Sequence, residues 1–332
     1  MEMQQKQSER ELALKMKEYI NNLNYLNAQS KHYMPNEVFK DLQANIETNP
    51  HVAFAYSYYY LISWLYKTVK YAEDLPIEIN TKTIKKLLGY NQNYKPINYI
   101  IKKNGVLEQI NYIKNEWDYP VQFYKEDEQL QFTTISDVDD YEYETIHKNR
   151  RTDYEIKYPI KHFYRNTEDN KKTGIFYDTA NTHVVPFEAF MHCMSSKNLG
   201  TTGFYLYAYL KYKNQLYRGG YDASRTKLAE ETGISRRALT NYLNALRAYN
   251  MIEVIHNQDY FSLNIKDTKA STIKVNDPEK FTRYEIGYKK LPIKKKSEVT
   301  DTNTFIEEEE PQKPTHNSSF SMMIKNEHKQ LS

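Results

Sequence analysis

The sequence predicts a mainly α-helical fold with small β-strands, an α+β class, arranged as two similar units along the chain. Apolar residues recur at helical spacing in several segments, and short alternating runs bounded by turn residues follow them. A length of 332 residues is typical of about two domains. We expect a helical arm at 1–35, a first domain at 36–135, an acidic-to-basic linker at 136–153, a second domain at 154–265 and a charged, mostly disordered tail at 266–332.

The segment 228–246 predicts two short helices joined by a glycine turn. Asp222 or Ser224 can cap the first helix, because short oxygen-bearing side chains accept from free backbone N–H groups at a helix start. Gly233 can adopt the positive φ that a tight turn between helices requires. Ser235 can cap the second helix in the same way.

The second helix of this pair has two chemically different faces. Leu239, Leu243 and Leu246 recur at the helical interval and should face the core. The opposite face carries arginines and amides without a carboxylate, and such side chains pair with guanine and adenine edges in the major groove of DNA. We therefore expect base-reading residues at Ser235, Arg236, Arg237, Thr240, Asn241 and Asn244.

Alternating residues after these helices predict a two-stranded wing. Residues 249–255 and 260–265 flank a polar turn at 256–259. Across residues 200–265 the pattern resembles the winged helix-turn-helix family, and the run Leu-Ala-Glu-Glu-Thr-Gly-Ile-Ser is its most specific part. The resemblance implies binding to double-stranded DNA. A helical hairpin that only packs against the protein is the alternative.

An earlier part of the chain looks like a degenerate copy of the same unit. Three pairs of segments correspond: 58–66 with 204–212, 81–89 with 226–233, and 105–110 with 250–255. The expected fold is therefore two winged helix-turn-helix domains in tandem, with small β wings, an N-terminal helix and a disordered C-terminal tail.

The reading helix of the first copy is expected at about 95–104, entered through Pro96, with Ile97, Ile100 and Ile101 facing inward. Its outer face is richer in point charges than in forked donors, which suits contact with phosphates better than base discrimination. The second copy contributes further basic residues beside its reading helix. We expect contacts to the DNA backbone from Lys95, Asn98, Tyr99, Lys102, Lys103, Arg225, Lys227 and Arg247.

Composition limits the possible partners. Lys and Arg number 46 against 43 Asp and Glu, a net charge of +3, so affinity for nucleic acid must come from local basic clusters. The single cysteine, Cys193, excludes an intramolecular disulfide and a cysteine-based zinc site, as is typical of the reducing cytoplasm. No apolar run approaches the roughly 20 residues that cross a bilayer. We expect a cytoplasmic protein with no metal, no cofactor and no membrane partner.

The two ends of the chain suggest protein contacts. One helical face of the first 30 residues is apolar and predicts a packing or homodimerisation arm, through Leu12, Met16, Ile20, Leu23 and Leu26. The tail alternates basic and acidic blocks, and it could contact replication or transcription machinery.

Motifs for catalysis are missing from the sequence. Its nine glycines form neither the Gly-x-x-x-x-Gly-Lys-Ser/Thr pattern that cradles a triphosphate nor the Gly-x-Gly-x-x-Gly pattern of dinucleotide sites. Its nine histidines include no His-x-His pair of the kind that places a metal beside a nicking tyrosine. We therefore expect that the protein is not an enzyme.

The layout of residues 36–265 resembles plasmid and phage replication initiators of the two-winged-helix class. In that class one module serves dimerisation and backbone contact, while the other reads repeated origin sequences. Two alternatives remain: a transcriptional regulator that binds an operator, and a partition or structural adaptor whose winged helices contact protein. The initiator predicts several tandem sites, the regulator one or two palindromic sites, and the adaptor no specific DNA.

Overall fold

The computed structural model describes residues 31–72, 79–127, 129–149, 156–165, 171–261 and 269–294. Most of the expected helical arm, 1–30, and the end of the tail, 295–332, lie outside these residues. Helices outnumber strands, and the strands form small antiparallel sheets, so the structure is mixed α and β. The last residues of the expected arm are a strand instead, β1 (Lys31–Pro35), because they pair in antiparallel register with β6 (Thr182–Pro186).

The first half of the chain continues from β1 through a series of helices and then a set of strands. Its elements are α2 (Val38–Asn45), α3 (Asn49–Lys67), α4 (Thr81–Leu87), α5 (Asn98–Ile101), α6 (Val106–Gln109), β2 (Ile113–Glu116), β3 (Pro120–Glu126), β4 (Gln129–Thr134), the 3-10 helix η1 (Ile135–Asp137) and α7 (Asp140–Asn149). The expected linker at 136–153 thus contains η1 and α7, whose first turn carries acidic residues that favour a helix N-terminus.

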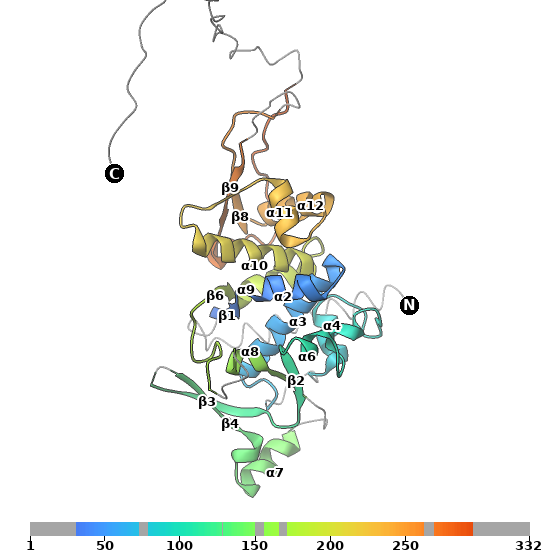
Figure 1. The fold of residues 1–332 in the computed structure, drawn as a ribbon, viewed down its shortest axis with the longest axis vertical. Coiled ribbons are helices and arrows are strands. Elements are labelled where there is room, and N and C mark those ends of the chain that lie inside the picture. Colours follow the sequence, from blue (N-terminus) through green and yellow to red (C-terminus); the bar gives the residue numbers. More distant parts are fainter. Residues whose placement is uncertain are drawn as a thin grey trace, which may run out of the picture.

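The second half repeats the order of strand and helices and ends in a three-stranded sheet. Its elements are β5 (Ile156–Pro159), α8 (Ile160–Phe163), β6, α9 (Phe187–Ser195), α10 (Gly200–Leu216), β7 (Tyr221–Ala223), α11 (Arg225–Thr232), α12 (Arg236–Ala248), β8 (Ile252–Ile255), β9 (Ser271–Val275) and the 3-10 helix η2 (Pro278–Lys280). The sheet order is β7-β9-β8, and β2 pairs with β5 and β3 with β4. Figure 1 shows α10 between α11 and α12 on one side and α2 and α3 on the other, with β3, β4 and α7 at the end opposite β8 and β9.

The helices of the two halves correspond in order up to α4 in the first half and α11 in the second. Asn80 caps α4 as Ser224 caps α11, which is a separation of 224 − 80 = 144 positions. Asn111 and Asn250 have positive φ at the entry to β2 and β8, a separation of 250 − 111 = 139 positions. The first half therefore holds five more residues between these landmarks, and they interrupt the helix that corresponds to α12.

The expected reading helix at 95–104 is wrong in length. It comprises only α5, because Lys102 adopts an extended conformation and Asn104 a positive φ. A Cβ on Gly105 would lie 2.6 Å from the Tyr99 carbonyl oxygen, so the chain passes tightly under α5 before α6 begins. Residues 105–110, expected to match the strand at 250–255, are mostly helix α6 for the same reason, and the matching strand is β2.

The wing and the tail also differ from expectation. The second wing strand was expected at 260–265, but the strand is β9, where Ile273 is buried between β7 and β8. Residue 261 instead forms a single bridge with Ile293, and 262–268 lie outside the described residues. The segment 269–294 is therefore part of the folded protein rather than of a disordered tail.

A single apolar core joins the two halves. Every residue from Val52 to Tyr66 on α3 is buried, and α3 packs against α10 through rings such as Tyr60 and Phe204, whose centroids are 4.9 Å apart. The tyrosine hydroxyls in this core need partners, since an unsatisfied buried polar group costs free energy. The Tyr60 hydroxyl accordingly donates to the Val185 carbonyl oxygen in β6 at 2.9 Å.

Two buried histidines complete the contact between α3 and the segments around β6. His183 donates from Nδ1 to the Asn36 side-chain oxygen at 3.1 Å and accepts from the Tyr56 hydroxyl at 2.8 Å. His162 donates from Nε2 to the Tyr33 carbonyl oxygen at 3.1 Å and lies 2.7 Å from the Tyr59 hydroxyl. Both patterns fit a neutral ring that donates through one nitrogen and accepts through the other. Burial lowers the pKa of each histidine to about 3.

These histidines predict acid sensitivity. Below about pH 6.5 each of these histidines is protonated in the unfolded chain but stays neutral in the folded protein. The free energy of unfolding should therefore fall by about 2 kcal/mol per histidine between about pH 7 and about pH 5. Urea titrations at the two pH values measure this. In His183→Gln the decrease in the free energy of unfolding between the same two pH values should be smaller by about 2 kcal/mol. A decrease equal to that of the wild type would contradict the lowered pKa of His183.

Candidate nucleic-acid interface

The helices α11 and α12 are the helix pair that the sequence pattern predicts, and they carry most of the candidate residues. The Ser224 hydroxyl accepts from the Lys227 backbone N–H at 3.1 Å, and the Ser235 hydroxyl accepts from the Ala238 N–H at 3.4 Å, so both helix starts are capped. Gly233 lies between them with φ of +71°, a left-handed conformation that glycine adopts without steric cost. The turn geometry therefore follows from the local sequence.

The two faces of α12 are divided as predicted. Leu239, Leu243 and Leu246 are buried, and they join the common core. The remaining candidates lie toward solvent: Ser235, Arg236, Arg237 and Asn241 are exposed, and Thr240 and Asn244 are half-buried. The Thr240 hydroxyl donates back to the Arg236 carbonyl oxygen at 2.9 Å, which leaves the lone pairs of that hydroxyl for another donor. Neither arginine forms an ion pair with a described carboxylate.

Side chains from the first half hold the α11–α12 turn in place. Asn49, at the start of α3, donates to the Thr232 carbonyl oxygen at 2.7 Å, and Gln43 on α2 donates to the Glu231 carbonyl oxygen at 2.9 Å. The Glu231 carboxylate in turn accepts from the Tyr221 hydroxyl at 2.6 Å and lies 3.5 Å from the Lys213 amine. The position of α12 is thus set by both halves of the protein and by residues that the sequence pattern does not mark.

The candidates in the first half divide into two groups. Lys95, Lys102 and Lys103 are exposed around α5. Asn98 accepts from the Lys85 amine at 2.5 Å, and the Tyr99 hydroxyl lies 3.0 Å from His51 Nδ1. These two polar groups support the local fold, and the three exposed lysines are the ones placed to meet an anion.

The backbone-contact candidates of the second half also differ from one another. Arg225 and Lys227 are exposed on the first turn of α11, and the Lys227 amine lies over the Tyr221 ring, 4.9 Å from its centroid. Arg247 is half-buried at the end of α12. Its guanidinium donates to the Lys289 carbonyl oxygen at 2.6 Å and lies 4.2 Å from the centroid of the Tyr288 ring, so it binds a later segment of the chain.

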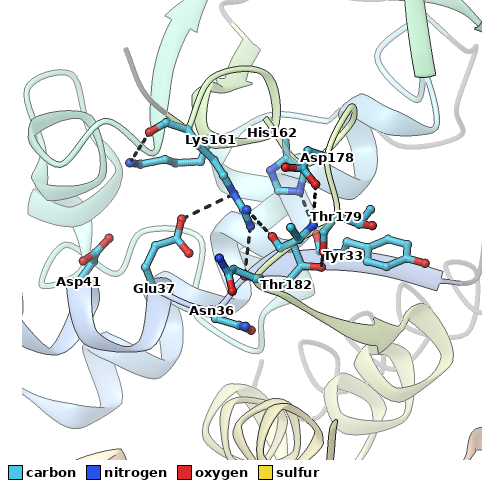
Figure 2. A network of polar contacts seen from close by, with 12 residues as sticks. Tyr33, Asn36, Glu37, Asp41, Lys161, His162, Asp178, Thr179 and Thr182 are labelled. Carbon is cyan, nitrogen blue, oxygen red and sulfur yellow. Dashed lines mark hydrogen bonds and ion pairs between the residues drawn. The ribbon is translucent and has the colours of Figure 1, made fainter. Parts of the chain in front are cut away.

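A second polar cluster lies between the halves, around Arg165 (Figure 2). The Arg165 guanidinium donates to the carbonyl oxygens of Ala180 and Asn181 and lies 3.8 Å from the Glu37 carboxylate. The Asn181 carbonyl oxygen also accepts from the Asn36 N–H at 3.0 Å. These contacts fix the chain entering β6 against the chain leaving β1, which is a structural role.

Within the described ranges, no group of three or more His, Cys, Asp or Glu side chains is placed to hold a metal ion. No helix in that part of the chain is both long and apolar enough to cross a membrane. No protein family model, curated protein or solved structure matches this chain.

The left-handed turn gives a first test of the site. Gly233→Ala should lower the free energy of unfolding by about 1–2 kcal/mol, because a Cβ disfavours the left-handed region and would lie 3.2 Å from the Asn49 amide nitrogen. Gly219→Ala is the matched control, since its Cβ would meet nothing within 4 Å. Equal stability of the two variants in denaturant titrations would show that the turn is not constrained.

Proposed function

We propose that the chain is a sequence-specific double-stranded DNA-binding protein whose second half is a winged helix-turn-helix unit. The order α10, β7, α11, α12, β8 and β9, with β9 central in the sheet, supports this assignment. In such units the second helix of the pair enters the major groove and its N-terminal residues contact base edges. Here that helix is α12.

The observation that carries the proposal is the solvent-exposed N-terminal end of α12. Arg236 and Arg237 lie there without a described ion-pair partner, Asn241 is exposed on the same helix, and the leucines of the helix are buried in the core. Each good bidentate pair between such a side chain and a base discriminates by about 1–3 kcal/mol. The free N–H groups of a helix start also attract phosphate. This end of α12 suits base reading.

The first half is proposed to contact the DNA backbone. Its helix equivalent to α12 is split into α5 and α6, so it lacks a continuous exposed face. The candidate contacts in the first half are three exposed lysines, Lys95, Lys102 and Lys103. Lysine is a point charge that binds phosphate without the planar geometry that selects a base.

The unequal halves favour a replication initiator over an operator-binding regulator. A symmetric dimer presents two identical helices and reads a palindrome. In this chain the two helix pairs differ and share one core, so a single molecule should read an asymmetric sequence. Asymmetric sites are suited to tandem direct repeats, as at an origin. We propose a non-enzymatic role in opening or marking such an origin.

Selection of bound fragments from random and host-element DNA tests the specificity. The wild-type chain should recover non-palindromic sites that recur as direct repeats. Arg236→Ala should change the recovered sequence, because the base pairs that this side chain contacts would no longer be discriminated. Recovery of palindromes overlapping a promoter would favour the regulator, and recovery of no consensus would favour a protein-binding adaptor.

Lysine substitutions test the division of labour. Lys102→Ala should weaken binding to all sequences alike and lower the slope of log K against log salt by about 0.9, the value for one released phosphate contact. The consensus should be unchanged. Lys171→Ala, an exposed lysine outside the proposed interface, serves as the control. If Lys102→Ala and Arg236→Ala had the same effect on specificity, the two halves would not have separate roles.

A further inference from the structure

The segment after β9 crosses the C-terminal end of α12, and we call residues 281–294 the strap. The Thr282 N–H donates to the Tyr249 carbonyl oxygen at 3.0 Å, and the Ile286 N–H donates to the Ala248 carbonyl oxygen at 2.8 Å. These bonds satisfy carbonyl groups at the end of α12 that have no partner within the helix. The Phe281 ring packs on Tyr207, with centroids 5.8 Å apart.

Further contacts hold the middle and the end of the strap. The Arg247 guanidinium binds the Lys289 carbonyl oxygen, as described above, and covers the Tyr288 ring. At the far end the Phe261 N–H donates to the Pro292 carbonyl oxygen at 2.8 Å, and the Lys294 N–H donates to the Phe261 carbonyl oxygen at 3.0 Å. The strap is therefore attached both to α12 and to the loop that follows β8.

The strap brings cations to this end of α12 and to the loop that follows β8. Lys289, Lys290 and Lys294 are exposed, and Arg225 is exposed at the start of α11. His256, just beyond β8, lies near several of them: its pKa is lowered by burial first and then by the charges of Arg247, Arg225 and Lys289. One cation each from α11, α12 and the strap thus lies close enough to His256 to act on it electrostatically.

None of Arg225, Lys289, Lys290 and Lys294 lies within ion-pair distance of a described carboxylate. Like charges that form no ion pairs raise the local potential, which attracts a polyanion. A bound polyanion would offset the mutual repulsion of these side chains.

We propose that the strap is a DNA-backbone contact site, in which Lys289, Lys290 and Lys294, together with Arg225, bind phosphates of the duplex that α12 reads. The proposal rests on the proposed function. The thirteen residues of α12 span about 20 Å, which exceeds the roughly 12 Å width of the major groove. With its N-terminal end at the base edges, a helix of this length extends out of the groove toward the bordering phosphates at its C-terminal end, where the strap lies.

The size of the effect follows from counterion release. The double variant Lys289→Gln and Lys290→Gln should lower the slope of log K against log salt by up to about 1.8, which is two contacts at about 0.9 each, for a random-sequence duplex. The consensus recovered by selection should stay that of the wild type, because lysine contacts to phosphate carry no sequence information.

A matched double variant, Lys171→Gln and Lys172→Gln, removes two exposed lysines near β4, at the end opposite the strap (Figure 1). Thermal unfolding of both variants checks that they remain folded. If the strap variant kept the salt slope of the control while wild type bound DNA, the strap site would be refuted and the proposed function would stand. If the wild-type chain bound no duplex at low salt, both proposals would fail.

Discussion

The burial of α3 on every side is the constraint on which the rest of the structure depends. A helix that is surrounded needs partners for each of its faces, and those partners come from both halves of the chain: β1 and β6 in one pairing, α10 along its length, and the segment before β6. Because α3 is rich in tyrosine, its hydroxyls also require acceptors or donors, and those of Tyr56, Tyr59 and Tyr60 find them in His183, His162 and the Val185 carbonyl. The two halves are therefore parts of one packed body.

This shared core has consequences for the candidate interface. Asn49 and Gln43, from the first half, hold the carbonyl groups of α11 just before the turn, so the angle of α12 is set from outside its own unit. The strap then secures the other end of α12 through Arg247. A helix that is held at both ends needs little further ordering to bind a ligand, and such preorganisation would favour affinity in the function proposed for α12.

Sequence reasoning was sufficient where the determinants are local. The caps at Ser224 and Ser235, the left-handed Gly233 and the buried leucine face of α12 each depend on residues within a few positions, and the structure has all of them. The predictions were wrong where an element depends on a pairing partner that is distant in the sequence. β9 is a strand because its backbone pairs with β7 on one side and β8 on the other. The helix α5 ends early because the first half has five additional residues before Asn111.

The sequence by itself determined the helix pair α11–α12 and the chemistry of its exposed face, since helix periodicity, capping and glycine φ are properties of short segments. The tertiary structure alone decided that both halves share one core, that Asn98 and Tyr99 serve the fold, and that Lys289 lies beside α12 and Lys294 beside the loop after β8 rather than in a free tail. The physical reason is that these features depend on hydrogen bonds and ring contacts between residues tens of positions apart, and a local pattern carries no record of such partners.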